Sequence, residues 1–258
     1  MTYDGGRWSR FVALGDSQTE GLADGDERTG YRGWADRLAE QMARSQPGAV
    51  YANLAVRGRR AAEVRSEQLP AALALRPTVA AVSAGVNDVL RTGFDARAVA
   101  DELDAMFVAL RAIDCVVVTM TFPRLAHPVP GGAAIGRRIT ALNHEIRRVA
   151  ARSDVAVIDL ALHDVASDPR LWSRDRLHLN STGHRRLADA AADVLGVPDS
   201  DDAWVVPLPP MPRSSLRERV AADTRWTVTF LLPWLLRRVR GRSSGDRRTA
   251  KRPQLASV

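Results

Sequence analysis

Apolar residues gather in five short runs along the first 160 positions of the chain, and segments with helical periodicity separate these runs. The runs occupy residues 11–14, 50–56, 79–83, 115–121 and 155–160. Short apolar runs that lack polar alternation are typical of strands buried on both faces of a sheet. The pattern therefore predicts five central strands.

The intervening segments repeat apolar residues three or four positions apart, which is the spacing of one helix face. Trp34, Leu38 and Met42 show this spacing at i, i+4 and i+8. The predicted helices lie within residues 34–42, 61–75, 96–113, 135–151 and 181–195, and Gly196 follows the last one as a stop signal. Strands that alternate with helices in this way predict an α/β fold, a three-layer α/β/α sandwich on a five-stranded parallel sheet.

The character of the chain changes after Pro198, which predicts one domain over residues 1–197 and an extension over residues 198–258. Prolines at 207, 209, 210 and 212 predict an extended linker. Ser215 and Glu218 have the spacing of a helix capping box. The apolar residues 226–236 follow, and the polar, basic residues 241–258 are predicted to be disordered.

The positive charge of the chain belongs to this extension. The formal net charge is +7, and residues 213–258 alone carry twelve Lys and Arg against three acids, so the rest of the chain is at −2. A near-neutral main domain gives no support for nucleic-acid binding, and we expect none.

Cysteine usage and the N-terminus point to a reducing compartment. Cys115 is the single cysteine and lies in an apolar run, where we interpret it as a core residue. The first seven residues contain no apolar stretch of signal-peptide length. We therefore expect a cytoplasmic protein. His, Cys, Asp and Glu nowhere show the spacing of a metal site, so no metal is expected.

The first candidate for chemistry is the turn after the first predicted strand, where residues 15–21 read Gly-Asp-Ser-Gln-Thr-Glu-Gly. Ligands bind at the carboxyl ends of strands in α/β sheets, and a serine there can serve as a nucleophile. The plain alternative is an ordinary turn, because Gly, Asp and Ser are common turn residues. The choice depends on whether the chain also supplies a base and an oxyanion hole.

Three further segments supply such groups. Gly58 follows the second strand and can offer its backbone N–H, and Asn87 follows the third and can donate from its side-chain amide. Asp175 and His178 lie three residues apart before the last helix, where a carboxylate can orient an imidazole. Each also has a plain interpretation: Gly58 can simply end a strand, Asn87 can cap a helix, and Asp175 and His178 can form an incidental ion pair. Jointly, they make a set that a serine nucleophile requires.

These four segments resemble, in order, the conserved blocks of the SGNH hydrolases, also called the GDSL esterase/lipase family. The resemblance covers residues 9–197. It implies a flavodoxin-like sandwich, a hydrolase of acyl esters and no cofactor. It further implies that Ser17 is the nucleophile, His178 the base and Asp175 the acid, and that Ser17, Gly58 and Asn87 form the oxyanion hole. An acyltransferase or thioesterase with the same triad is the alternative.

The extension lies outside the resemblance and leaves two interpretations open. Residues 226–240 are too short to span a bilayer, but arginines flank them, so they suit the surface of an anionic membrane. The other interpretation is that they pack on the main domain as a lid or strap. A peripheral membrane adaptor without catalytic turnover is the matching non-enzymatic hypothesis.

A few other residues are candidates for roles at the site. His127, in the loop after the fourth strand, either lines the pocket or is a solvated loop residue. Trp172, which precedes Asp175, either forms a wall of the active site or packs in the core. His144, His163 and His184 have no partner that the sequence identifies. Asp16 and Asp88 are expected to hold loops through side-chain to backbone hydrogen bonds.

Overall fold

The computed structural model describes residues 6–127, 129–211, 215–239 and 244–258. The strands are β1 Arg10–Gly15, β2 Gly25–Asp26, β3 Gly30–Tyr31, β4 Val50–Asn53, β5 Val79–Ser83, β6 Val116–Met120, β7 Ala156–Ile158 and β8 Arg252–Ser257. The α-helices are α1 Ser17–Glu20, α2 Trp34–Ser45, α3 Ala61–Glu63, α4 Leu69–Ala74, α5 Val86–Val89, α6 Ala96–Arg111, α7 Gly132–Arg152, α8 Ser181–Leu195, α9 Leu216–Trp226 and α10 Leu232–Val239. Two π-helical turns are η1 Val64–Gln68 and η6 Thr227–Leu231, and the 3-10 turns are η2 Leu160–Leu162, η3 Asp164–Ser167, η4 Pro169–Leu171 and η5 Asp202–Val205.

The central sheet has the strand order β7-β6-β5-β1-β4-β8 within the described residues. All neighbouring pairs from β7 to β4 are parallel, as predicted, and β8 adds one antiparallel strand at the edge. β2 and β3 form a separate small hairpin. The sheet of an α/β sandwich is thereby confirmed, with a sixth strand that was not predicted.

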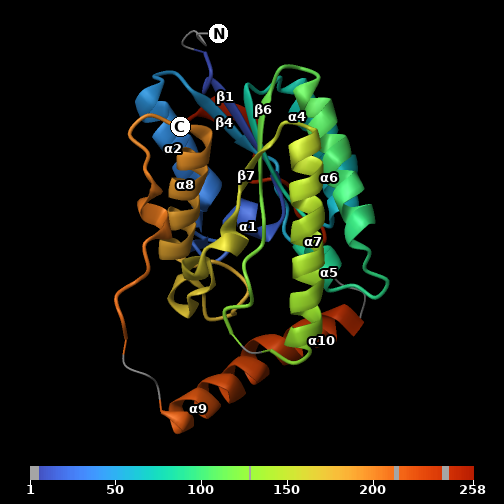
Figure 1. Cartoon of the computed structure of the whole chain (residues 1–258), viewed down its shortest axis with the longest axis vertical. Helices are drawn as coiled ribbons and strands as arrows, with labels where there is room; N and C mark the ends of the chain where they lie inside the picture. Colours follow the sequence, from blue (N-terminus) through green and yellow to red (C-terminus); the bar gives the residue numbers. More distant parts are fainter. Residues whose placement is uncertain (1–5, 128, 212–214, 240–243) are drawn as a thin grey trace.

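The parallel strands send alternate side chains to two separate cores, and helices cover both faces of the sheet (Figure 1). Phe11 and Ala13 of β1 face a core shared with α2 and α8. Val12 and Leu14 face the opposite core, which contains residues of α6 and α7. The parallel strands therefore end together at one edge, and the loops that follow them meet there.

The helix predicted over residues 61–75 is interrupted by the π-helical turn η1. Pro70 lies in the first turn of α4 and has no N–H, so a regular α-helix cannot continue through it. The wider turn places Gln68 in a buried position. That position proves important for the strand that leads to Ser17.

The prediction of disorder for residues 241–258 is wrong for residues 244–258, while residues 241–243 lie outside the described residues. β8 pairs with β4, and Leu255 packs against a core cluster. Lys251 binds Asp36 at 2.6 Å, which ties the extension to α2. The sequence signal was weak because β8 contains a proline, few of its residues are apolar, and it forms only against an existing sheet edge.

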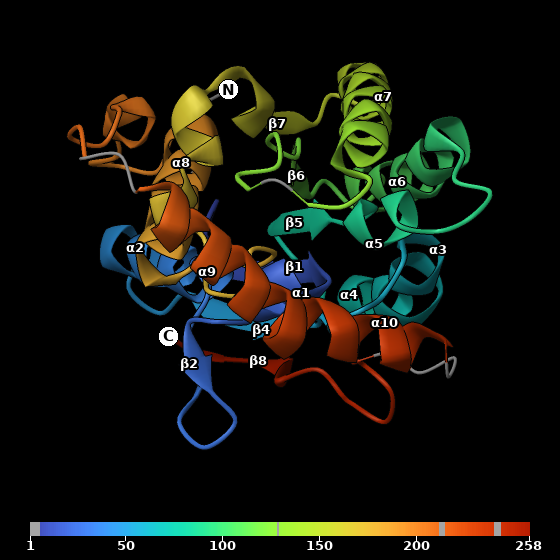
Figure 2. The ribbon, with the colours of Figure 1, turned by 90° about the horizontal axis from the view of Figure 1, so that it is seen from below.

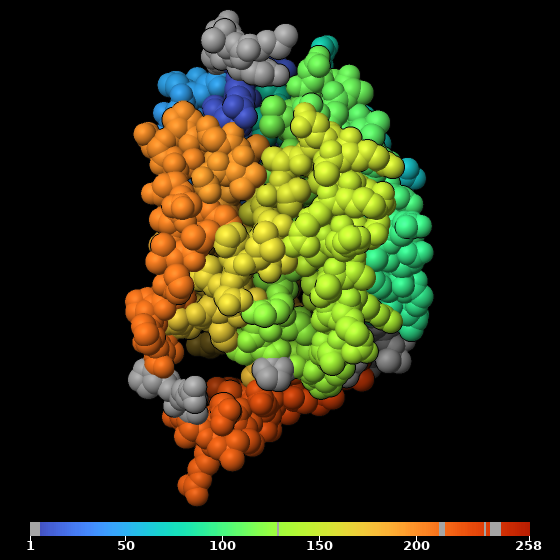
Figure 3. Space-filling view, viewed as in Figure 1, coloured from blue at the N-terminus to red at the C-terminus, as the bar shows by residue number. Residues whose placement is uncertain are grey.

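The extension contains one long helical segment, in which α9, η6 and α10 follow one another without a break. Its capping box at Ser215 and Glu218 is present, as predicted. Figures 1 and 3 show this segment along the bottom of the molecule, and Figure 2 shows it crossing the edge of the sheet at which α1 and α5 lie. Pro212 of the linker and Arg240 lie outside the described residues. Within the parts of the chain that the structure describes, no helix combines the length and apolarity that crossing a membrane requires.

Candidate active site

Ser17 is the first residue of α1, directly after β1 ends. Asp16 caps this short helix by accepting a hydrogen bond from the Gln18 N–H. Only glycine fits at position 15, because a Cβ there would lie 2.5 Å from the Ser83 carbonyl oxygen of β5. The serine is 8% exposed, so its hydroxyl lies in a confined position at the edge of the sheet.

The structure brings Ser17, His178 and Asp175 into one hydrogen-bonded chain. His178 Nε2 lies 2.8 Å from Ser17 Oγ, and His178 Nδ1 lies 2.7 Å from Asp175 Oδ2. The carboxylate fixes the tautomer with the proton on Nδ1, which leaves Nε2 free to accept the serine proton. The arrangement is suited to activating a serine hydroxyl.

The aspartate of this chain is held by its own turn. Asp175 Oδ1 accepts hydrogen bonds from the N–H groups of Leu177 and His178 and from Ser173 Oγ. Burial opposes ionisation, but these bonds and the contact with His178 hold the pKa of Asp175 well below its usual range. Asp175 is therefore a carboxylate at neutral pH, available to stabilise a charged imidazole.

Asn87 lies in α5, the short helix that follows β5, and Gly58 lies on the loop after β4. Asn87 Nδ2 donates to Asp16 Oδ2 at 3.1 Å and to the Arg59 carbonyl at 3.0 Å. Asn87 is thus linked directly to the residue before Ser17 and to the residue after Gly58. Gly58 has a φ of 79°, and its N–H has no hydrogen-bond acceptor among the described residues.

Two supporting contacts were not found from the sequence. The amide of buried Gln68 bonds both the N–H and the carbonyl of Gly15, at 2.8 and 2.9 Å, and so fixes the end of β1. Buried Glu20 accepts from the backbone N–H and the guanidinium of Arg57, beside Gly58. The π-helical turn that carries Gln68 would have pointed to this residue, since such turns are frequent at functional sites, but the sequence pattern did not predict the turn.

Asp16 and Asp88 hold loops, as expected. Asp88 accepts from the Ala61 N–H at 3.0 Å. Burial raises the pKa of Asp16 to about 7, although its hydrogen bond from Gln18 acts in the opposite direction. Asp16 therefore connects the turn of residues 16–18 to Asn87.

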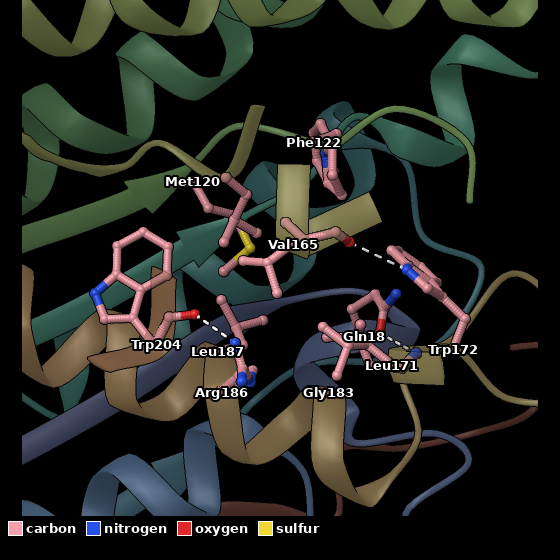
Figure 4. Close-up of a pocket in the computed structure, with 14 residues that line it drawn as sticks. Gln18, Met120, Phe122, Val165, Leu171, Trp172, Gly183, Arg186, Leu187 and Trp204 are labelled. Carbon is pink, nitrogen blue, oxygen red and sulfur yellow. Dashed lines mark hydrogen bonds between the residues drawn. The ribbon is translucent and has the colours of Figure 1, made fainter. Parts of the chain in front are cut away.

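An apolar cavity of about 60 Å³ lies between the ends of β6 and β7 and helix α8 (Figure 4). Gln18 and Leu179, the neighbours of Ser17 and His178, are among its lining residues. Trp172 lines the cavity and also donates its indole N–H to the Ala166 carbonyl, so it is both a wall and a packing residue. The cavity offers apolar contact next to Gln18, the residue that follows Ser17.

The histidines other than His178 make structural contacts. The sequence identified no partner for His184, and the structure supplies two: its ring accepts from the Trp34 N–H and donates to the Leu22 carbonyl. Burial lowers the pKa of His184 to about 4, so the ring is neutral. His163 packs against Trp204, and burial together with Arg176 lowers the pKa of His127. Within the described residues, no group of His, Cys, Asp and Glu could hold a metal ion.

Solved structures share the fold. TesA aligns with a TM-score of 0.58 and 24% identity over 72% of this chain and 97% of that one. The psychrotrophic esterase EstA from Pseudoalteromonas sp. aligns with a TM-score of 0.57 and 19% identity over 73% and 97%. A variant of Axe2, an acetyl xylan esterase from Geobacillus stearothermophilus, aligns with a TM-score of 0.58 and 16% identity over 73% and 95%. At these identities the likeness shows the fold alone.

The family follows from the sequence match. No curated protein matches the chain. The model of the GDSL-like lipase/acylhydrolase family matches residues 13–186, which include Ser17, Gly58, Asn87, Asp175 and His178. The chain therefore belongs to the GDSL-like lipase/acylhydrolase family and is a serine hydrolase that acts on ester bonds.

Proposed function

We propose that the protein hydrolyses carboxylic acyl esters through a Ser17–His178–Asp175 triad. The observation that carries this proposal is the continuous hydrogen-bonded chain from Ser17 Oγ through both ring nitrogens of His178 to Asp175. His178 takes the serine proton while Oγ attacks the ester carbonyl. His178 then donates this proton to the leaving alcohol, and the acyl group remains on Ser17.

The second half of the reaction regenerates the enzyme. Water gives a proton to His178 and attacks the acyl-serine, and the acid leaves when the proton returns to Ser17 Oγ. The N–H groups of Ser17 and Gly58 and the amide of Asn87 stabilise the oxyanion in both steps. Both protons of the Asn87 amide have acceptors in the free protein, so one must turn from Asp16 or Arg59 to the substrate.

A p-nitrophenyl ester series from acetyl to palmitoyl tests this proposal, with the native protein, Ser17→Ala and the control Ser66→Ala, an exposed serine of η1. We expect hydrolysis by the native protein and the control, and none by Ser17→Ala. We also expect a fluorophosphonate probe to label the native protein and not Ser17→Ala. Equal hydrolysis by Ser17→Ala and the native protein would show that another residue is the nucleophile.

The same triad supports an acyltransferase or a thioesterase, because only the acceptor or the leaving group differs. An added alcohol acceptor separates the first alternative, since a transferase would form the new ester in preference to the free acid. Thioester substrates in the same series separate the second. The complete set of hydrogen-bonded triad residues argues against a non-catalytic adaptor.

We also propose contact between the extension and an anionic membrane surface. Apolar side chains are exposed along the helical segment of residues 216–239; they are Leu216, Val220, Val228, Phe230, Leu232 and Leu236. Residues 213–258 carry nine net positive charges. An exposed apolar stripe with flanking arginines is the pattern of a helix that lies in a membrane interface.

A further inference from the structure

The inner side of the extension helix contacts the turn that carries the triad acid and base. Trp226, at the end of α9, is only 6% exposed. Its indole N–H donates to the backbone carbonyl of Asp175 at 2.8 Å. The extension thus forms a hydrogen bond to the catalytic turn itself, although the family match ends at residue 186.

A second contact from the same helix grips the neighbouring residue of that turn. Arg176 pairs with Asp223 at 2.7 Å, and its guanidinium lies over the Trp226 ring, 4.9 Å from the centroid. The Arg176 side chain is only 9% exposed as a result. Asp223 and Trp226 lie one helical turn apart on α9, so both can contact Arg176. The ion pair and the ring contact together hold the Arg176 side chain.

The backbone of this turn has an unfavourable conformation, which contacts from outside the turn can stabilise. Arg176 has a φ of 63°, in the left-handed region that non-glycine residues rarely adopt. Backbone of this kind persists where the surrounding structure fixes it. The N–H groups of Leu177 and His178 bond Asp175 Oδ1 only while the turn keeps this shape.

We propose that Trp226 and Asp223 of the C-terminal extension are positioning residues of the active site, which hold the turn of residues 175–178 so that His178 reaches Ser17. The inference rests on the proposed triad. It assigns the extension a part in catalysis that lies outside the family domain. The extension then acts on the reaction through Asp175 and Arg176, without contacting the substrate.

Kinetics of the full chain with Trp226→Phe and Asp223→Asn test the proposal. Phenylalanine keeps a ring beside Arg176 but removes the indole N–H, and asparagine removes the charge that pairs with Arg176. We expect kcat on a short p-nitrophenyl ester to fall about tenfold in each variant, because small misplacements of catalytic groups are costly, and KM to change less than twofold. Fluorophosphonate labelling of Ser17 is expected to slow by a similar factor.

Two matched controls distinguish positioning from general stability. Trp8→Phe changes an equally buried tryptophan, 7% exposed, in the segment that leads into β1, and Asp154→Asn breaks the Arg111–Asp154 pair. Neither residue contacts the catalytic turn, and we expect kcat to stay within twofold in both. Equal losses of kcat in test and control variants, or an unchanged kcat in Trp226→Phe, would overturn the proposal. So would a rise in KM alone, because it would indicate a role in substrate binding.

Amide hydrogen exchange provides a readout that is independent of ester hydrolysis. We expect the N–H groups of Leu177 and His178 to exchange at least tenfold faster in Trp226→Phe than in the native protein, and at the native rate in Trp8→Phe. Unchanged exchange in Trp226→Phe would overturn the inference even if the esterase is active. Faster exchange in a chain that hydrolyses no ester would instead keep the structural coupling and refute the proposed function.

Discussion

At the scale of single residues, the candidate site depends on polar groups that already have partners before a substrate arrives. Asn87 donates to Asp16 and to the Arg59 carbonyl, Gln68 brackets Gly15, and Glu20 holds Arg57. Each contact links two segments that meet at the carboxyl edge of the sheet. The contacts of Gln68 and Glu20 can persist during the reaction and keep these segments oriented, whereas Asn87 must exchange one of its two bonds for the substrate oxyanion.

Replacement of Asn87 by alanine is expected to lower kcat by about 10²–10³, the usual effect of losing one oxyanion donor. The physical reason is that alanine cannot donate to the developing negative charge. KM is expected to change much less, since the interaction strengthens in the transition state. Steady-state kinetics together with far-UV circular dichroism measure both the loss and the retention of fold. A native turnover number in Asn87→Ala would exclude Asn87 from the oxyanion hole.

At the scale of secondary-structure elements, local patterns predicted the main domain well. The alternation of apolar runs and helical faces predicted β1, β4, β5, β6 and β7 and the helices between them, because burial on two faces leaves a clear signal. The predicted helix over residues 181–195 coincides with α8, between the Asn180 cap and Gly196. Ser17, Asp175 and His178 could be proposed as candidates from the sequence because their motifs are local, and the structure brings the three side chains together.

Elements that depend on distant partners were missed. β8 forms only because β4 offers an edge, and the Gln68 contact requires a π-helical turn that no apolar period reveals. The bond from Trp226 to Asp175 joins residues that are 51 positions apart. Sequence patterns describe faces of single elements, and they carry little information on which surfaces a later segment will meet.

The segment before β8 passes close to the backbone of Arg57 at Gly245. Gly245 is buried, and a Cβ there would lie 2.0 Å from the Arg57 carbonyl oxygen. We expect Gly245→Ala to destabilise the protein by about 1–3 kcal/mol, the cost of overpacking, and to increase amide exchange in β8. Gly136 lies inside α7 with open space around it, so Gly136→Ala is expected to stabilise by up to about 1 kcal/mol. Denaturant unfolding measures both, and a neutral Gly245→Ala would refute the close approach.

At the scale of the whole molecule, the extension helix is connected to the main domain at both ends. On the linker side, Arg170 and Arg186 donate to the carbonyls of Pro209 and Val206. On the other side, β8 joins the sheet. The helical segment therefore lies across the edge of the sheet at which α1 and α5 lie (Figure 2). Trp226 is buried against Asp175, whereas Val228, Leu232 and Leu236 are exposed. Contact of the outer side with a lipid surface would place the catalytic edge toward the membrane.

Vesicle co-sedimentation tests whether the protein contacts an anionic membrane. We expect the full chain to pellet with vesicles of phosphatidylcholine and phosphatidylglycerol, but not with phosphatidylcholine alone, because nine net positive charges of the extension attract an anionic surface. Raising the ionic strength is expected to release the protein, since salt screens exposed charges. Absence of pelleting with anionic vesicles, or equal pelleting with both types, would refute the proposed contact.

Substitutions on the outer side decide whether the helix itself makes the contact. Val228 and Leu232 are 60% and 47% exposed, and serine at both positions removes apolar area that would enter the interface. We expect Val228→Ser/Leu232→Ser to lose most vesicle binding while it hydrolyses a soluble ester at the native rate, because neither residue touches the catalytic turn. Leu162→Ser, at a position 70% exposed on η2, is the matched control and is expected to bind as the native protein does. Native binding by the double variant would place the lipid contact elsewhere. If the native protein is a dimer and the double variant a monomer in sedimentation velocity, these residues bind a second copy of the chain instead.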